Sequence, residues 1–331
     1  MSREVTAGWK RALPGLVVSA LALAVVFALS DPRRLWDALR RMPPWAWVGA
    51  ALLLALSLAL RAAAWRVLLL ERVAWAEAFW ALDAGYLVNN IIPFRAGEAT
   101  RALLIAPKAG VSFWHALSTV LVERLLDVLM LAGLLVGSLP WVLDLPWARR
   151  TSWVFGGAAL GGLLALMAAA RYRGAIASRL EVGQQQPAAS TLRQTLTRWL
   201  LAFLNGLEAL THPGALAKVG GLMALSWAVQ VLAYTITLQA LVPRASWLWA
   251  AFALGSVGMG IAVPSAPGGV GVMEGVIVFV LGALGIEASV ALAYALVMHG
   301  VYYLVTGLLG WIGITVYGVA WRDLMARVRA Q

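Results

Sequence analysis

Residues 89 to 101, NNIIPFRAGEATR, interrupt a long apolar stretch with groups that could bind an anion. Proline removes a backbone donor from a helix and glycine permits a turn, so Pro93 and Gly97 predict a break that frees backbone amides and carbonyls. A half-helix that begins near Gly97 would point its positive N-terminal end at this break, where phosphate binds readily. The residues of this first cluster are Asn89, Asn90, Pro93, Arg95, Gly97, Glu98 and Arg101.

The arginines of the first cluster suggest what it binds. Arg95 and Arg101 carry guanidinium groups, whose paired N–H donors match the geometry of a phosphate. A structural interpretation is also open, because Glu98 and Arg101 have the i, i+3 spacing of an ion pair on one helical face. The proline would then be only a bend at a membrane interface.

A second cluster lies in LSTVLVERLLDVLMLAG, where Glu123, Arg124 and Asp127 interrupt an apolar run. Glu123 and Asp127 are four residues apart and share one helical face. A charge at the centre of a lipid-facing helix costs about 2.5 to 3.5 kcal/mol, so this face must turn toward protein or water. The three charges either line a polar pathway or neutralise one another and hold the helix against the first cluster, and both can be true.

A third cluster lies in VPSAPGGVGVMEG, residues 263 to 275, and on the last apolar run of the chain. Its glycines let backbone approach a ligand closely, and Glu274 places a carboxylate at membrane depth. For His299 we expect a hydrogen bond between helices rather than a role as proton carrier. The candidate binding residues of this cluster are Pro267, Gly268, Gly269, Gly271, Glu274, His299 and Tyr302.

The elements that must position these clusters are membrane helices. Of 331 residues, 62% are hydrophobic and 12% charged, against about 25% charged in soluble proteins. The sequence predicts an all-α multi-pass membrane protein with a single integral membrane domain, residues 1–331. Two apolar stretches, 79–107 and 247–287, are each split by a cluster and predict broken or re-entrant helix pairs. Six full spans are expected near residues 13–30, 45–70, 112–138, 151–170, 219–241 and 289–320.

Loop charge predicts the orientation of these spans. With both termini cytoplasmic, the inner segments 1–12, 61–78, 95–108, 171–218 and 321–331 hold 18 of the 26 lysines and arginines, as the positive-inside rule requires. The net charge of +11 therefore reflects membrane topology rather than nucleic-acid binding. Residues 31–47 place four arginines outside, which favours an amphipathic interfacial helix there. We interpret the N-terminal apolar run as an uncleaved first helix.

The predicted topology contains a repeat. Residues 13–138 and 151–320 each read span, span, broken pair, span, with 171–218 as a cytoplasmic connector. Three crossings per half is an odd number, so the second half would sit inverted relative to the first. The spacing of the motifs supports this pairing, because Pro93, Gly97 and Glu98 correspond roughly to Pro267, Gly271 and Glu274. Inverted repeats with broken helices are typical of secondary transporters.

Signatures of enzymes are missing from this sequence. It contains no HExxH, GxSxG or P-loop motif, no cysteine, and its three histidines are scattered at 115, 212 and 299. We therefore expect no metal, no cofactor and no catalytic residue.

The three clusters together resemble the signature segments of the lysylphosphatidylglycerol synthase transmembrane-region family, which includes flippase domains and stand-alone YbhN-type proteins. The resemblance implies a prokaryotic cytoplasmic-membrane protein with a flippase-like fold that handles phospholipids or other amphiphilic lipids. No segment here corresponds to the soluble aminoacyl-transfer domain of the full synthases, so that activity is not expected. The matching positions are Asn89, Pro93, Gly97, Glu98, Arg101, Glu123, Arg124, Asp127, Pro267, Gly268, Gly269, Gly271 and Glu274.

The function expected from the resemblance is a lipid flippase or scramblase whose cavity lies between the two halves. Glu98, Asp127 and Glu274 are the candidates for proton coupling. Arg95, Arg101 and Arg124 are the candidates for holding an anionic headgroup. Membrane lipids are the expected partners, and a homo-oligomer or an association with a lipid-synthesis enzyme is left open.

An alternative function is a membrane enzyme or accessory subunit that acts on a lipid-linked sugar or a polyprenyl phosphate. Paired carboxylates facing an arginine in a closed, one-sided pocket would favour that alternative. A cavity open to both leaflets would favour transport.

Overall fold

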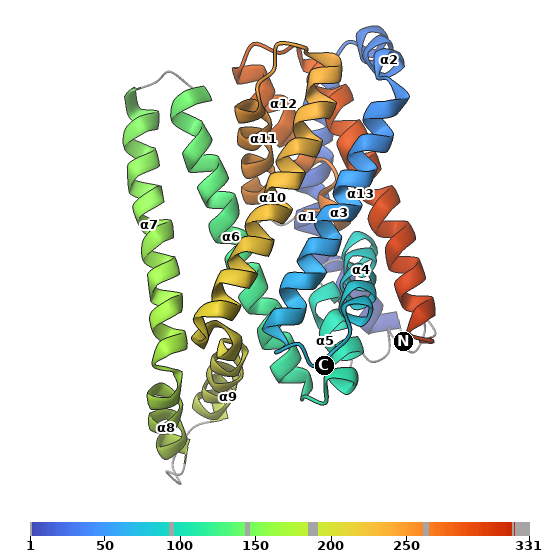
Figure 1. Ribbon diagram of the computed structural model, residues 1–331. Coiled ribbons are helices and arrows are strands. Elements are labelled where there is room, and N and C mark those ends of the chain that lie inside the picture. The colour runs from blue at the N-terminus through green and yellow to red at the C-terminus, as the bar shows by residue number, and fades with distance from the viewer. Residues whose placement is uncertain are drawn as a thin grey trace.

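The computed structural model describes residues 2–92, 96–142, 146–184, 191–260, 265–319 and 321. Every regular element within these residues is a helix, and the longer helices run roughly side by side (Figure 1). The elements up to the middle of the chain are α1 (Ser2–Ala28), α2 (Pro32–Arg41), α3 (Pro44–Leu68), α4 (Trp75–Ile91), α5 (Ala96–Ala109), α6 (Phe113–Val142) and α7 (Pro146–Arg171).

The rest of the chain continues the same all-helical pattern. Two short helices and a 3₁₀ turn connect α7 to the next long helix, within the expected connector 171–218. These elements are α8 (Arg173–Gln184), α9 (Thr191–Gly206), η1 (Glu208–Thr211), α10 (Pro213–Leu241), α11 (Trp247–Gly260), η2 (Pro267–Gly269), α12 (Val272–Ala283) and α13 (Ala288–Val316).

Four of these helices are long and apolar enough to cross a bilayer, namely α3, α6, α10 and α13. The apolar part of α1 meets α2 at a bend of 90°, and counting that pair as one span gives up to five. The apolar part of α7, Gly156–Arg171, is shorter than the roughly 20 residues that a span needs. The prediction of six full spans is therefore not confirmed. Both α1 and α7 begin with polar residues, which shorten their apolar parts.

The two broken stretches form helical hairpins at opposite ends of the bundle (Figure 1). Helices α4 and α5 pack against each other, and so do α11 and α12. The breaks fall where Pro/Gly sequence predicts them, after Ile91 and after Gly260. Pro93 and Arg95 of the first cluster lie outside the described residues.

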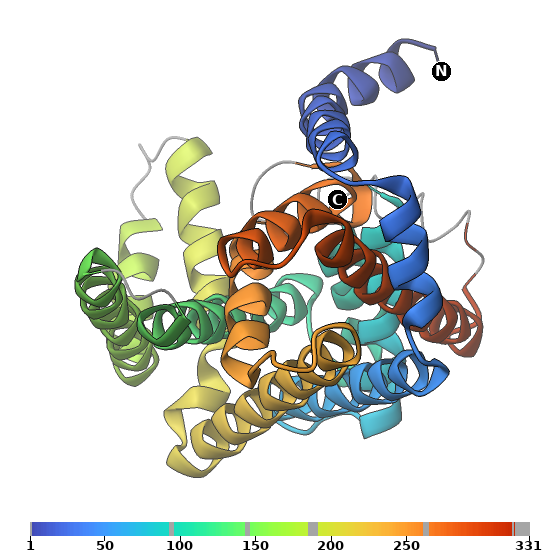
Figure 2. The same cartoon turned by 90° about the horizontal axis from the view of Figure 1, so that it is seen from above.

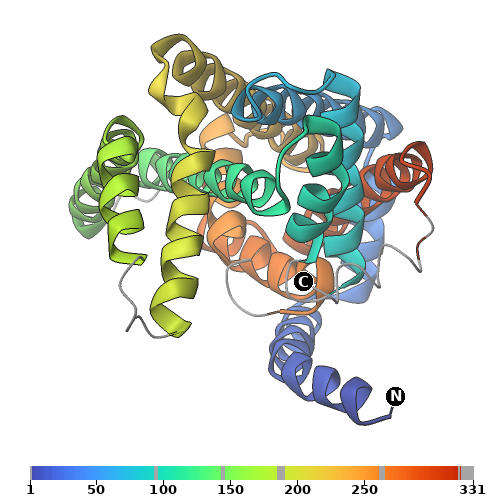
Figure 3. The ribbon, with the colours of Figure 1, turned by 90° about the horizontal axis from the view of Figure 1, so that it is seen from below.

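The hairpins pack into a central group of long helices. Helix α3 packs along α10, α4 packs on α13, and α11 packs on α6. Helices α1 and α7 stand at the edge of this group when the molecule is viewed from either end (Figures 2 and 3). Apolar side chains on their outer faces are exposed, including Leu21 and Trp153. An apolar outer face is what a lipid-facing helix requires.

The helix expected within residues 31–47 is present as α2. Asp31 caps its N-terminus, because its Oδ1 accepts hydrogen bonds from the backbone N–H groups of Arg33 (2.8 Å) and Arg34 (3.4 Å). Pro32 occupies the first helical position, where no backbone donor is needed. The helix packs on α13 and buries Ala38, so its arginines face outward at the end of the bundle.

Candidate functional site

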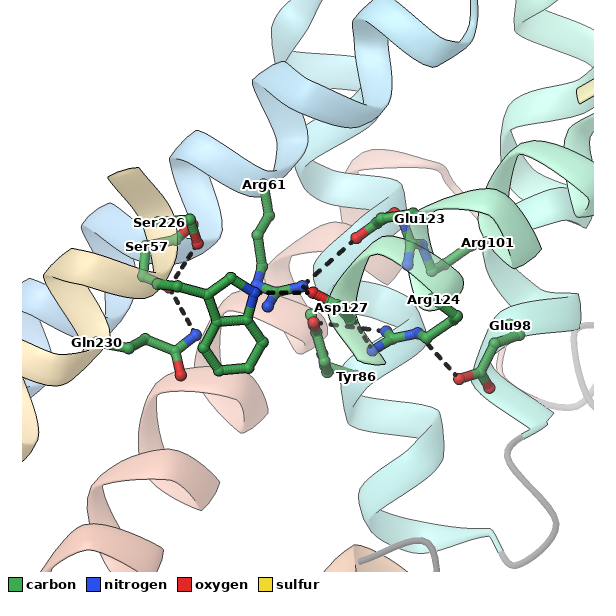
Figure 4. A network of polar contacts seen from close by, with 11 residues as sticks. Ser57, Arg61, Tyr86, Glu98, Arg101, Glu123, Arg124, Asp127, Ser226 and Gln230 are labelled. Atoms are coloured by element: carbon green, nitrogen blue, oxygen red, sulfur yellow. Dashed lines mark hydrogen bonds and ion pairs between the residues drawn. The ribbon is translucent and has the colours of Figure 1, made fainter. Parts of the chain in front are cut away.

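The charged residues of the first and second clusters meet Arg61 in a set of six buried or partly buried charged residues, which we call the charge network (Figure 4). Three arginines and three carboxylates form it, so its formal charge is zero. They come from α5 of the α4–α5 hairpin and from α6 and α3, and α6 packs on both α5 and α3. Its members are Arg61 on α3, Glu98 and Arg101 on α5, and Glu123, Arg124 and Asp127 on α6.

Each arginine of the charge network is paired. Arg61 Nη1 lies 2.7 Å from Asp127 Oδ1 and 3.7 Å from Glu123 Oε1. Arg101 pairs with Glu123 through its Nη2. Arg124 lies 3.2 Å from Asp127 and 3.5 Å from Glu98. The i, i+3 pair between Glu98 and Arg101 is not among these contacts, because each residue pairs with α6 instead.

Burial divides the network into a closed part and an accessible edge. The side chain of Glu123 is 0% exposed, and those of Arg101 and Arg61 are 2% and 3% exposed. Arg124 is 26% exposed and Glu98 is 14% exposed. A charge buried without its partner is strongly unfavourable, so the closed part holds α3, α5 and α6 together. Arg124 and Glu98 are therefore the members of the network that are most exposed.

Aromatic rings complete the surroundings of the three guanidinium groups. Arg61 lies over Trp227 with 4.7 Å to the ring centroid, and Arg101 lies over Trp65 with 4.2 Å. Arg124 lies 5.6 Å from the centroid of Tyr86. Such contacts stabilise a desolvated cation by about 2 kcal/mol. They partly replace the water that the guanidinium groups lose on burial.

The asparagines of the first cluster fix the start of α5. Gly97 donates its backbone N–H to Asn89 Oδ1 at 2.8 Å, and the Asn89 amide donates to Glu98 Oε2 at 3.3 Å. Asn90 donates to Thr306 Oγ1 on α13 at 2.8 Å. The backbone N–H of Gly97, which was expected to bind an anion, therefore already donates to a side chain of the same hairpin.

The third cluster is also brought together, around the loop between α11 and α12. His299 Nδ1 lies 2.5 Å from Glu274 Oε1, and His299 Nε2 lies 3.1 Å from the carbonyl oxygen of Gly268. Gly271 donates its N–H to Glu274 Oε2 at 2.7 Å. Gly268, Gly269 and Gly271 all have positive φ, between 69° and 84°, which glycine adopts without steric cost.

A row of aromatic side chains connects the third cluster to the charge network. His299 contacts Tyr303, with ring centroids 4.8 Å apart, and Tyr303 contacts Tyr302 at 6.2 Å. Tyr302 in turn contacts Tyr86 at 6.4 Å, and Tyr86 is the ring beside Arg124. The candidate residues of both hairpins therefore belong to one contiguous polar and aromatic region.

Two charged residues of this region, Arg61 and Asp83, were not predicted as site residues, and the buried Arg61 and Arg101 change the loop-charge count. Arg61 was assigned to the cytoplasmic segment 61–78, whereas it is buried inside α3, so it does not count toward the loop charge. Arg101, in segment 95–108, is likewise buried and leaves that count. Asp83 on α4 is fully buried, and neither of its carboxylate oxygens has a hydrogen-bond partner. An isolated Asp in FWALDAGYLV was the signal for it.

Two surface cavities lie away from the charge network. They have volumes of about 620 and 250 Å³ and flank α2, one lined by residues 28–33 and the other between α2 and the start of α13. Neither is lined by a residue of the charge network, which agrees with the burial of that network. Within the described residues, no three His, Asp or Glu side chains form a group that could hold a metal ion.

The helical bundle with its apolar outer surface, its paired hairpins and its buried charges defines a multi-pass membrane protein. The chain belongs to the lysylphosphatidylglycerol synthase transmembrane-region family, whose model matches residues 13–310. It is also similar to a protein of Haloferax volcanii named glycosyltransferase AglD, with 26% identity over 327 residues. That match covers 88% of this chain but only 52% of the relative, so the chain spans about half of its length. No solved structure matches the chain.

Proposed function

We propose that this protein moves lipids with anionic headgroups between the leaflets of a prokaryotic cytoplasmic membrane, as a flippase or scramblase for phospholipids or similar amphiphiles. The observation that carries the proposal is the charge network, in which two buried arginines and the partly exposed Arg124 lie beside a break in the helices. Buried ion pairs are a poor means of stabilising a fold, since apolar residues of similar volume serve as well or better. Six ionised groups in one place therefore favour a binding role.

The accessible edge of the network is where a headgroup would bind first. Arg124 holds Glu98 through a single contact of 3.5 Å, whereas a phosphate can accept two parallel hydrogen bonds from one guanidinium group. A phosphate would therefore displace Glu98 from Arg124. Asp127, at 3.2 Å, would keep Arg124 in position during this exchange.

Displacement of Glu98 would also loosen the α4–α5 hairpin. Glu98 is in the first turn of α5 and accepts a hydrogen bond from Asn89 at the end of α4. Its release would free the hairpin to move away from α6 and expose Arg101 as a second site for the phosphate. The headgroup would pass along the polar region while the acyl chains stay in the surrounding lipid.

The topology that belongs to this proposal has six spans and two re-entrant hairpins in two inverted halves. Helices α1 and α7 would be the fifth and sixth spans. Support comes from the hairpins, which lie at opposite ends of the bundle (Figure 1), as two inverted halves require. Both termini and the α8–α9 connector would be cytoplasmic, by the positive-inside rule. The chain contains no ATPase motif, so transport would follow a gradient or couple to an ion.

A second candidate function is favoured by one relative, which is named a glycosyltransferase. On this reading the protein would be an enzyme or an accessory subunit that acts on a lipid-linked sugar, with the network binding its phosphate. The two functions share the same ligand chemistry but differ in product. An enzyme changes the lipid covalently, whereas a translocase changes only the leaflet in which the lipid resides.

The test is reconstitution of the purified protein in liposomes that contain fluorescent lipids with different headgroups. A reductant that cannot cross the membrane quenches only the outer leaflet, so translocation appears as quenching beyond the outer half. We expect faster translocation of anionic lipids than of a fluorescent lipid with a neutral sugar headgroup. Analysis of the same lipids by mass spectrometry separates the second function. Covalent change without translocation would support the enzyme and contradict the translocase.

A further inference from the structure

The imidazole of His299 lies between two hydrogen-bond acceptors. Its Nδ1 faces the Glu274 carboxylate at 2.5 Å and its Nε2 faces the Gly268 carbonyl at 3.1 Å. A neutral imidazole has one N–H, so it can donate to only one of two acceptors. Both contacts are favourable in two protonation states. In one, the imidazole is doubly protonated; in the other, the Glu274 carboxyl is protonated and its O–H donates a hydrogen bond to Nδ1. In either form the pair carries one proton more than an ionised Glu274 beside a neutral His299.

This proton helps to hold the loop of residues 265–271, which contains η2 and leads into α12. His299 and Tyr303 on α13 hold the carbonyl groups of Gly268 and Pro267, the latter at 3.1 Å. Ser19 on α1 accepts the N–H of Ala266 at 2.8 Å. Hydrogen bonds at three consecutive residues thus hold the loop against α1 and α13. Among these bonds, only the one from His299 has a donor that can lose its proton near neutral pH.

We propose that Glu274 and His299 form a proton-binding site that closes the 265–271 loop against α13, and that loss of the proton opens the second hairpin. When the proton leaves, the remaining imidazole N–H donates to the Glu274 carboxylate. The lone pair of Nε2 then faces the Gly268 oxygen, and two acceptors repel each other. The loop is thus closed at low pH and released as the pH rises.

The buried carboxyl of Asp83 is on α4, and the Asp83 backbone lies against Gly310, which is eleven residues, or about 16 Å, along α13 from His299. The closer surroundings contain few other groups that could produce the same response. Residues 13–28 of α1 and residues 265–271 contain no titratable side chain. Tyr302 and Tyr303 on α13 and Tyr86 on α4 are phenols, which ordinarily stay neutral up to about pH 10. Arg124, beyond Tyr86, stays charged at any working pH.

The two hairpins would therefore differ in what controls them. Glu98 in the first hairpin is paired with Arg124, whose guanidinium group does not lose its proton. Glu274 in the second hairpin is paired with a histidine, a side chain that can gain or lose a proton. The role of this site in lipid movement rests on the proposed function, but the opening of the loop does not.

The loop can be observed directly because the chain has no cysteine. Ala266→Cys introduces a single thiol in the loop. At each pH, the alkylation rate of this thiol in the folded protein is divided by its rate in the unfolded protein. This ratio removes the intrinsic pH dependence of the thiol. We expect the ratio to rise about tenfold between about pH 5.5 and pH 8.5, the effect of losing one charge-assisted hydrogen bond. An unchanged ratio would overturn the proposal.

Two variants in the Ala266→Cys background make the test specific. In Glu274→Gln the amide oxygen accepts the Gly271 N–H and the amide nitrogen donates to His299 Nδ1, so His299 donates permanently to Gly268. This variant should be closed at every pH, and a ratio that rises as in the parent would overturn the proposal. Tyr303→Phe removes the hydrogen bond to the Pro267 carbonyl, whose phenol donor does not titrate near neutral pH. The alkylation ratio of this variant should therefore be higher than that of the parent at every pH and should still rise with pH. Translocation of lipid enters none of these measurements.

Discussion

At the scale of single residues, the charge network is balanced, and each arginine in it contacts both a carboxylate and an aromatic ring. Arg101 is its most enclosed cation, stacked on Trp65 and paired with Glu123. Its Nε and Nη1 have no hydrogen-bond partner. Arg101 therefore depends on Glu123 in this conformation, and a phosphate could bind it only after the hairpin moves.

The dependence of Arg101 on Glu123 predicts a non-additive double mutant. Arg101→Leu leaves Glu123 with only the 3.7 Å contact to Arg61, so we expect a loss of about 3 to 5 kcal/mol in the free energy of unfolding. Arg101→Leu combined with Glu123→Leu removes both charges and should recover most of that loss. Denaturant unfolding in detergent measures both. Additive losses would contradict the assigned pair.

Sequence reasoning at this scale predicted which residue types lie in the network but not all of its partners. Glu98, Arg101, Glu123, Arg124 and Asp127 stood out because each interrupts an apolar run. Arg61 did not stand out, because it is close to Arg66 near the expected end of a span. Its burial is set by α6 and α10, which supply Asp127 and Trp227 and are distant in sequence.

At the scale of elements, the α4–α5 hairpin is closed by contact between two glycines. A Cβ atom on Gly97 would meet the carbonyl oxygen of Gly85 and the side chain of Asn89, both on α4. Small residues let helices approach this closely in membrane proteins. The close approach places Asn89 where it can accept the Gly97 N–H and donate to Glu98.

This contact predicts that Gly97→Ala is destabilising although alanine favours a helix. The added methyl group would push α5 from α4, and we expect a cost of about 1 to 3 kcal/mol in unfolding free energy. Gly282→Ala on α12 is the matched control, because nothing lies within 4 Å of its Cβ position. Thermal unfolding of the two variants compares them. Equal stability of Gly97→Ala and the parent would show that the hairpin packs differently.

Breaks between elements were predictable from sequence, whereas the lengths of the spans were less so. Proline and glycine interrupt helices through local backbone chemistry, and α4 and α11, the first helix of each hairpin, both end close to these residues. The positive φ of Gly271 and the contact of its Cβ position with Ser19 were not predictable. They depend on α1 packing against α12.

At the scale of the whole molecule, the proposed function requires that the two hairpins enter the membrane from opposite sides. The α8–α9 connector lies at the same end of the bundle as the α4–α5 hairpin, and α2 lies at the other end with the α11–α12 hairpin (Figure 1). The orientation of these ends relative to the cell follows from loop charge alone, and it stays a prediction.

Single cysteines in this cysteine-free chain test the orientation. Gly174 on α8 and Pro243 after α10 are both exposed. We expect Gly174→Cys to react with a membrane-impermeant maleimide only after the cells are opened. Pro243→Cys and Arg33→Cys should react in intact cells. Labelling of Gly174→Cys and Pro243→Cys from the same side would rule out the inverted halves.

The measurement that tests the central claim most directly is lipid translocation by Arg124→Gln in liposomes, beside Arg40→Gln as the control. Both changes remove a guanidinium group that lies over an aromatic ring, but Arg40 is on α2, outside the network. We predict that Arg124→Gln lowers the translocation rate of anionic lipid at least about tenfold, as expected for the loss of a charged hydrogen bond. Arg40→Gln should retain the parent rate. Equal rates for the two variants, with both proteins folded, would contradict a role for the charge network in lipid movement.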